Sequence, residues 1–120
     1  MAGEISFFEI GVQDAEQGRA FYQELFGWDT EPGPTGNGPL LRAGRTQGGI
    51  HGGDAEGGTY LFFRVDDMDA AIERVRQLGG RLHEYDLSTQ EDPDVAAAYG
   101  RFRLCRDDQG STFGLHQPPA

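Results

Sequence analysis

The sequence predicts an α+β fold built from two tandem βαβββ modules, and three observations predict it. A strand-like run rich in aromatic and β-branched residues occurs twice, at residues 7–14 and 60–67, and each copy ends in aspartate. Apolar residues at helical spacing follow each aspartate, and both helical patterns end at glycine. Short strand candidates follow in both halves. We expect a single domain over residues 1–120, with module one at 5–51, a linker at 52–58 and module two at 59–117.

The helices have start and stop signals in the sequence. Asp14 and Asp67 are predicted N-caps, because an aspartate carboxylate accepts hydrogen bonds from the free N–H groups of the first turn. Gln17 follows Asp14 at the spacing of a capping box. We expect the first helix to end at Gly27 and the second at 79–80, where a constant offset between the copies pairs Gly27 with Gly80.

The remaining strands are predicted from short apolar or alternating runs between glycine-rich turns. The turn at 107–110 has glycine at its last position, where a hairpin favours positive φ. Residues 90–94 are predicted to form a solvated loop. The expected strands are 28–30, 40–43 and 48–51 in the first module, and 81–85, 101–106 and 111–117 in the second.

Composition excludes several classes of function. The chain has 20 acidic and 10 basic residues and a formal net charge of −10, which argues against a nucleic-acid partner. No apolar run approaches the ~20 residues of a membrane span, so we expect no membrane partner. Cys105 is the single cysteine, which excludes a disulfide framework within the chain and leads us to expect a reducing, cytoplasmic location. All ten basic residues are arginine, so Schiff-base chemistry on lysine is also excluded.

Short motifs distributed over nearly the whole chain resemble one superfamily. They are Phe8-Glu9-Ile10 with Asp14, Phe21-Tyr22, Leu25-Phe26-Gly27-Trp28, Gly48-Gly49-Ile50, Val65-Asp66-Asp67, Leu78-Gly79-Gly80, Gly100-Arg101-Phe102 and Asp107 to Gly110. In this order the chain resembles the vicinal-oxygen-chelate superfamily, which includes glyoxalase-, bleomycin-resistance- and extradiol-dioxygenase-like proteins. The resemblance implies a U-shaped, barrel-like sheet around a cavity. It also implies that enzymes of the superfamily hold a divalent metal there, which polarises two adjacent substrate oxygens.

The metal-ligand positions that the resemblance implies are mostly lost in this chain. They fall on Phe7, Tyr60 and Gly114, with a fourth near His51, and only His51 could coordinate the ion. We therefore expect no cofactor and no metal.

A displaced metal site is an alternative. Glu9, His51 and His116 could form a set of two histidines and one carboxylate, shifted along the strands from the usual positions. The competing interpretation leaves both histidines exposed at strand ends and pairs Glu9 with an arginine, for which Arg64 is the candidate.

Strand alternation predicts which side chains face the cavity and which face the helices. Phe8, Ile10, Leu61 and Phe63 are expected to face the helices. Phe7, Glu9, Tyr60 and Phe62 are expected to face the cavity and form the inward set. Trp28 and Phe102 are expected beside this set on adjoining strands, although the aromatic rings could also simply fill the space of a lost metal. The predicted ligand-binding residues are Phe7, Glu9, Trp28, His51, Tyr60, Phe62, Arg64, Phe102, Gly114 and His116.

Two functions from different classes follow. The first is a metal-independent, homodimeric small-molecule-binding protein that sequesters an aromatic or hydrophobic ligand such as an antibiotic, as the drug-resistance branch of the superfamily does; such a protein has no catalytic residue. The second is a metal-free isomerase, cyclase or lyase that uses Glu9, Tyr60 and His116 as acid or base. A metalloenzyme with the displaced site is a third possibility.

Overall fold

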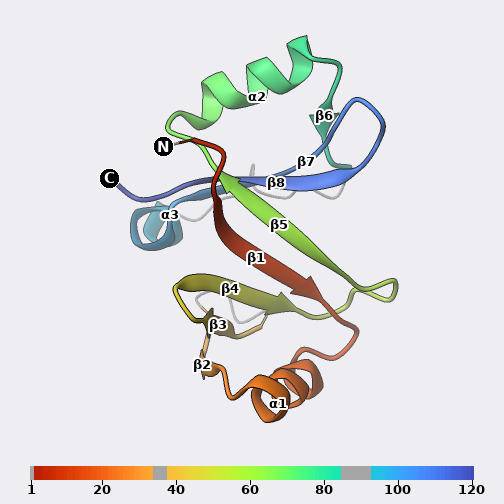
Figure 1. Cartoon of the computed structure of the whole chain (residues 1–120), viewed down its shortest axis with the longest axis vertical. Coiled ribbons are helices and arrows are strands. Elements are labelled where there is room, and N and C mark those ends of the chain that lie inside the picture. The colour runs from red at the N-terminus through yellow and green to blue at the C-terminus, as the bar shows by residue number, and fades with distance from the viewer. Residues whose placement is uncertain (1, 34–37, 85–92) are drawn as a thin grey trace. The chain divides into compact units, whose positions relative to one another are not determined.

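The computed structural model describes residues 2–33, 38–84 and 93–120 of the chain (Figure 1). The chain divides into two compact units: the N-terminal unit, Phe7–Leu61, and the C-terminal unit, Met1–Ser6 with Phe62–Ala120. The elements in chain order are β1 (Ile5–Gly11), α1 (Ala15–Phe26), β2 (Asp29–Glu31), β3 (Leu40–Ala43), β4 (Thr46–His51), β5 (Gly58–Arg64), α2 (Met68–Gln77), β6 (Arg81–Leu82), α3 (Pro93–Tyr99), β7 (Arg101–Arg106) and β8 (Thr112–Gln117).

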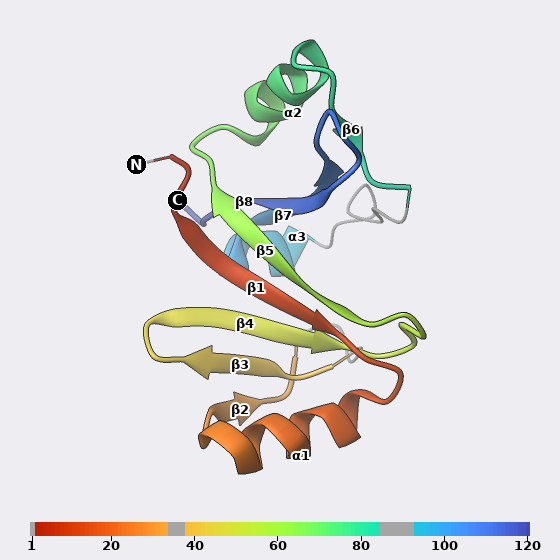
Figure 2. The ribbon, with the colours of Figure 1, turned by 45° about the vertical axis from the view of Figure 1, so that its right-hand side comes forward.

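The α+β class and the repeated βαβββ order are confirmed, with α3 inserted in the second repeat. Neighbouring strands follow the order β2-β3-β4-β1 in the first repeat and β5-β8-β7-β6 in the second. In each repeat the first and last strands pair in parallel and the other pairs are antiparallel. Within its own repeat, α1 contacts β2 and β4, and α2 contacts β6 and β8 (Figure 2).

Both helices begin at the predicted aspartates. Asp14 accepts a 3.0 Å hydrogen bond from the Gln17 N–H, and Asp67 accepts one of 3.1 Å from Ala70. Gly27 ends α1 in the left-handed region with φ 71°. In α2 the corresponding conformation belongs to Gly79, with φ 92°, and not to Gly80, which the constant offset had paired with Gly27. The left-handed glycine after the second helix therefore comes one residue earlier than that alignment predicts, and α2 itself ends at Gln77.

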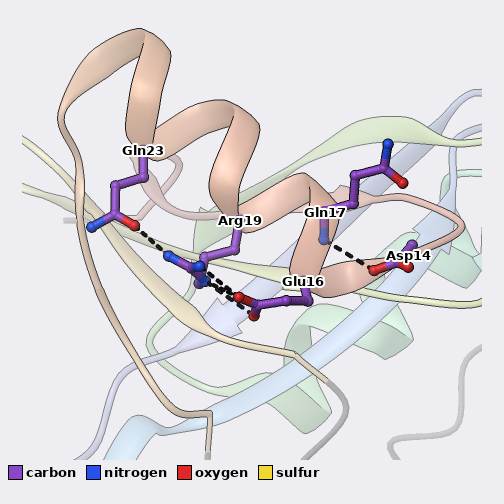
Figure 3. A network of polar contacts seen from close by, with 5 residues as sticks. All are labelled: Asp14, Glu16, Gln17, Arg19 and Gln23. Carbon is purple, nitrogen blue, oxygen red and sulfur yellow. Dashed lines mark hydrogen bonds and ion pairs between the residues drawn. The ribbon is translucent and has the colours of Figure 1, made fainter.

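The exposed side of α1 carries a polar network (Figure 3). The guanidinium of Arg19 donates to both carboxylate oxygens of Glu16, at 2.9 and 3.0 Å from Nε, and also to Gln23. The hydrogen bond from Arg19 lowers the pKa of Glu16. Because this pair is open to solvent, it contributes little to stability.

Strand boundaries agree with the sequence to within a few residues, but one helix was missed. β3 and β7 match their predicted bounds, whereas β6 is only two residues long. The loop predicted at 90–94 is wrong at Pro93 and Asp94, which begin α3. A proline at the first helical position followed by an alanine-rich run favours this helix. Residues 90–92 lie outside the described residues.

Each repeat buries its own apolar core against its helix. Phe8 and Ile10 lie in the first core with Leu41 and Ile50, as alternation predicts. The second core comprises Met68, Ile72, Cys105 and Leu115. The prediction that Leu61 faces a helix is wrong, since its side chain is 41% exposed. The β5–β8 pairing begins one residue later, at Phe62, so Leu61 precedes the paired segment. In the described part of the chain, no helix has the length and apolar character needed to cross a membrane.

Candidate functional site

Four polar side chains of the N-terminal unit form the candidate site, which we call the His51 cluster: Glu9, His51, Asp54 and Tyr60. Glu9 lies on β1 and His51 at the end of β4, and the parallel register pairs Glu9 with Gly49 and Gly11 with His51. Residues paired in this way project from the same face, which is opposite to the face that carries Phe8 and Ile10. The cluster therefore lies on the side of the strands that the helix-side core leaves open.

The imidazole of His51 lies between two carboxylates. Its Nδ1 is 3.1 Å from Glu9 Oε1, and its Nε2 is 3.2 Å from Asp54 Oδ2. The side chains of His51, Glu9 and Asp54 are 27%, 25% and 19% exposed, so the group is mostly covered but still reachable by solvent. The hydrogen bond to Glu9 raises the pKa of His51, and the bond to Asp54 adds to this effect while burial opposes it. Both carboxylates thus favour the imidazolium form.

Asp54 holds the cluster together from the loop between β4 and β5. The loop is attached to the end of β1 by backbone hydrogen bonds, including one of 3.0 Å from Asp54 N–H to Val12 O. Asp54 Oδ1 accepts from Gly57 N–H at 2.9 Å, and Oδ2 accepts from the Tyr60 hydroxyl at 3.2 Å. The Gly57 N–H is the main cause of the lowered pKa of Asp54. The Tyr60 ring lies nearly parallel to the His51 ring, with 6.1 Å between centroids.

Sequence reasoning did not select Asp54. The available signal was an aspartate bracketed by glycines in the linker at 52–58, a pattern typical of a turn in which the carboxylate bonds a backbone N–H. That signal predicts the turn but not the bonds to His51 and Tyr60, because these depend on where the loop packs.

Two glycines provide the space for the cluster. A Cβ on Gly11 would lie 2.1 Å from Asp54 Oδ2 and 2.7 Å from His51 Nε2. A Cβ on Gly49 would lie 2.9 Å from Glu9 Oε2. Any larger residue at Gly11 would collide with the carboxylate, so the cluster depends on a bare backbone beneath it.

The C-terminal unit has a counterpart, which we call the His116 cluster: Phe62, Phe102, Gly114 and His116. The register pairs Phe62 with Gly114 and Phe102 with His116, which places all four on one face. The Phe62 ring covers Gly114 so closely that a Cβ there would lie 2.1 Å from a ring carbon. Phe62 and Phe102 meet edge to face with 5.7 Å between centroids. This face is therefore filled by aromatic rings.

His116 is a buried, neutral member of that cluster. Its Nε2 donates to Tyr99 O at 2.9 Å, which leaves Nδ1 to accept from the Ser6 hydroxyl at 2.9 Å. The imidazole stacks on Phe102 with 4.4 Å between centroids and is 7% exposed. Burial lowers the pKa of His116, and the charge of Arg64 lowers it further. Both ring nitrogens are thus engaged in structural hydrogen bonds.

Two further predicted ligand-binding residues, Phe7 and Trp28, lie on opposite sides of the strands of the N-terminal unit. Phe7 is 6% exposed and precedes Glu9 by two residues on the same strand face. Trp28 lies on the helix side instead, packed against Phe8 and Tyr22 at 5.5 and 5.8 Å between centroids. The expectation that Trp28 accompanies the inward set is therefore corrected, because its ring completes the core under α1.

Arg64 lies in the C-terminal unit, and its acidic neighbours there are Glu4 and Asp66. Its Nε is 3.8 Å from Glu4 Oε1 and 4.0 Å from Asp66 Oδ1, and Glu9 bonds to His51. Both Arg64 distances are too long for hydrogen bonds, and this buried Nε has no hydrogen-bond partner within the described residues.

The residues present do not fit the divalent metal that the fold implies. Within residues 2–33, 38–84 and 93–120, no group of three or more His, Cys, Asp or Glu side chains is arranged to hold an ion. Glu9 and His51 bond to each other, while His116 uses both nitrogens for Ser6 and Tyr99. At the implied ligand position Gly114, the Phe62 ring occupies the space beside the backbone.

Comparisons with known proteins agree with this architecture. A family model described as "Glyoxalase-like domain" matches residues 7–116. A curated relative, the "Glyoxylase-like domain-containing protein" of Didymella fabae, is 30% identical over 128 residues, covering 98% of this chain and 95% of that protein.

Solved structures share the fold at lower identity. Methylmalonyl-CoA epimerase from Mycobacterium tuberculosis matches with a TM-score of 0.63 and 22% identity, over 98% of this chain and 89% of that one. A hypothetical protein from Bacillus halodurans C-125 matches with a TM-score of 0.66 and 12% identity, over 98% of this chain and 96% of that one. The 2,2',3-trihydroxybiphenyl 1,2-dioxygenase of Sphingomonas wittichii matches with a TM-score of 0.64 and 20% identity, over 100% of this chain and 42% of that one. These identities show a shared fold, and the fold carries several activities.

Proposed function

The chain belongs to the glyoxalase-like domain family of the vicinal-oxygen-chelate superfamily, and from this premise we propose that it is a metal-independent small-molecule-binding protein whose ligand site is the His51 cluster. The observation that carries the proposal is the set of partly exposed polar groups held over Gly11 and Gly49. Polar side chains that converge on one strand face and stay reachable are typical of groups that orient a ligand.

The proposed ligand is an aromatic or hydrophobic small molecule, with sequestration of an antibiotic as the corresponding physiological role. Support comes from the rings beside the polar groups: Tyr60 stacks on His51, and Phe7 lies on the same strand face as Glu9. An aromatic ligand gains about 0.5–1.5 kcal/mol per ring contact beyond the area that it buries. We propose that the protein acts in the cytoplasm as a homodimer. Light scattering would test the dimer by measuring its molar mass in solution.

Metal independence is supported by the chemistry of the implied ligand positions. Phe7 offers no donor atom, and the Phe62 ring covers Gly114. A divalent ion needs several oxygen or nitrogen ligands around it, and the side chains at Phe7 and Gly114 provide none.

The test is binding in the presence of EDTA. Aromatic fragments are titrated into the protein while NMR follows the ring signals of His51 and Tyr60, with those of His116 and Phe102 as the internal control. The proposal expects saturable shifts at His51 and Tyr60, and recovery of the fragment chemically unchanged. Ligand responses that need an added divalent metal would contradict it.

Acid–base catalysis is a second candidate, favoured by one specific observation. The imidazole of His51 lies between the Glu9 and Asp54 carboxylates and beside the Tyr60 hydroxyl, a set of groups that can hold and transfer protons. In D₂O an enzyme of this kind would exchange acidic C–H hydrogens of a bound substrate. Glu9→Gln would then lower the exchange rate at least ~100-fold, whereas a binding protein would retain its ligand and show no exchange.

A further inference from the structure

We infer that the His51 cluster selects a cation: a ligand whose ammonium group donates a hydrogen bond to Glu9 Oε2. This inference rests on the proposed function, because it names the chemical class of ligand that the same site would bind. Three features of the cluster point to it, namely an acceptor without a partner, the balance of charges, and the aromatic ring beside the carboxylates.

Glu9 has one oxygen that the protein leaves unused. Oε1 bonds to His51 Nδ1, but Oε2 makes no hydrogen bond or ion pair with any residue in the described ranges. Oε2 lies over Gly49, 2.9 Å from where a Cβ would stand, so the bare backbone keeps this position open. Because the Glu9 side chain is 25% exposed, Oε2 can be reached from solvent, and an N–H group of a ligand can take the place of water there.

Asp54 differs from Glu9 in this respect. Oδ1 accepts from Gly57 N–H, and Oδ2 accepts from Tyr60 and faces His51 Nε2. Both oxygens are therefore occupied by the protein. Asp54 fixes the position of His51 and Tyr60, while Glu9 is the carboxylate left to meet a ligand.

The charges of the cluster favour a cationic donor over a neutral or anionic one. Glu9 and Asp54 supply two negative charges, and a protonated His51 supplies one positive charge. Neither carboxylate forms an ion pair with an arginine in the described part of the chain. The remaining charge is negative, as is the net charge of the whole chain, −10. An approaching carboxylate would be repelled, and a cation attracted.

The ring of Tyr60 adds a second element that suits a cation. It lies 12° from parallel to the His51 ring, and its hydroxyl is bonded to Asp54, so its orientation is fixed beside the carboxylates. A tyrosine ring near a carboxylate attracts ammonium groups through its quadrupole as well as through contact area. The negative charge of the cluster, the available Oε2 of Glu9 and the Tyr60 ring thus all favour a ligand with an ammonium group.

The experiment compares three probes of nearly equal size: 2-phenylethylamine, 2-phenylethanol and 3-phenylpropionate. Each is titrated near neutral pH with EDTA into the full chain, with NMR shifts of His51 and Tyr60 as the readout. We expect the amine to bind at least about tenfold more tightly than the alcohol, and the carboxylate to bind most weakly.

Two variants localise the effect. Glu9→Gln keeps the size of the side chain and removes its charge, so amine affinity falls about tenfold while alcohol affinity changes less than about threefold. Glu16→Gln is the matched control, because it removes the same charge from the exposed face of α1 (Figure 3). It should leave the affinity for all three probes unchanged.

The outcomes separate the inference from the proposed function. If the alcohol or the carboxylate binds as tightly as the amine, or if Glu16→Gln weakens the amine as much as Glu9→Gln does, cation selection is wrong while binding at the cluster stands. If none of the probes shifts His51 or Tyr60, the proposed site itself is contradicted. Should Glu9→Gln fail to fold, the order of affinities of the three probes for the unmodified protein still tests whether the cluster selects a cation.

Discussion

His51 and His116 occupy equivalent places in the two repeats. His51 is the last residue of β4 and His116 is the next-to-last residue of β8. The carbonyl of each accepts a 2.9 Å hydrogen bond from the valine after the first strand of its repeat, Val12 or Val65. Their side chains have opposite surroundings. His51 is partly exposed between two carboxylates, which favour its charged form, whereas His116 is buried among aromatic rings in its neutral form.

The difference originates two residues earlier along the fourth strands. Gly49 and Gly114 are equivalent, and each lies under a side chain of the first strand, Glu9 or Phe62. A carboxylate at this position attracts a histidine as an ionic partner, while a phenyl ring fills the space and excludes water. One backbone plan therefore yields a polar, reachable group in one repeat and a packed aromatic group in the other.

The largest expected effect comes from adding one methyl group at the equivalent glycines. Gly114→Ala would place its Cβ 2.1 Å from the Phe62 ring, which is 7% exposed and has little room to move. We expect it to lower the free energy of unfolding by about 2–3 kcal/mol. Gly49→Ala meets only the flexible end of Glu9, at 2.9 Å, and should cost less than about 1 kcal/mol. Urea unfolding measures the free energy of unfolding of both variants. Equal losses of stability would contradict the claim that Gly114 is packed more tightly than Gly49.

The next effect comes from removing the two imidazoles. His116→Leu leaves the Ser6 hydroxyl and the Tyr99 carbonyl without their partner, at a cost of about 1–2 kcal/mol. His51→Leu breaks two ion pairs that water can partly replace, so its cost should stay below about 1 kcal/mol. Thermal unfolding of the two variants at one pH measures the difference. A larger loss of stability for His51→Leu than for His116→Leu would mean that the main role of the His51 cluster is to stabilise the fold.

The sequence predicted most of the fold and three of the four residues of the His51 cluster. Aspartate N-caps, alternation and turn glycines depend on neighbours in sequence, so both helices that begin at Asp14 and Asp67 were found. His51 and Tyr60 were selected at metal-ligand positions that the superfamily resemblance implies, and Glu9 was selected because strand alternation places it on the same face as Phe7. Asp54 and the helix-side position of Trp28 were missed, because each depends on how a loop or short strand packs after it leaves the regular pattern.

The helix N-caps should reveal no difference between the repeats. Asp14→Ala and Asp67→Ala each remove one hydrogen bond to the first turn, of 3.0 and 3.1 Å, from an exposed position. Each should cost about 1 kcal/mol. Chemical denaturation measures both, and a difference of more than about 1 kcal/mol would show that the two helices depend on their caps unequally.

The smallest expected effect is an opposite pH dependence of the two histidine contributions. The folded-state pKa of His51 is raised, so its stabilisation is complete below the ordinary value of about 6.5 and is lost as the pH rises through the folded-state pKa. The folded-state pKa of His116 is lowered, so its stabilisation is present above about 6.5 and is lost as the pH falls through the folded-state pKa. His51→Leu should therefore cost more at about pH 5.5 than at about pH 8.5, and His116→Leu should show the reverse. Unfolding free energies at both pH values would check the two signs.

The equivalent histidines of the two repeats favour opposite charge states, and an NMR pH titration of the two imidazoles tests this difference most directly. The His51 and His116 ring signals are followed in one sample, with assignments taken from the two leucine variants. We expect His51 to titrate above the ordinary histidine pKa of about 6.5 and His116 to titrate below it. Coincident titrations, or the reverse order, would contradict it.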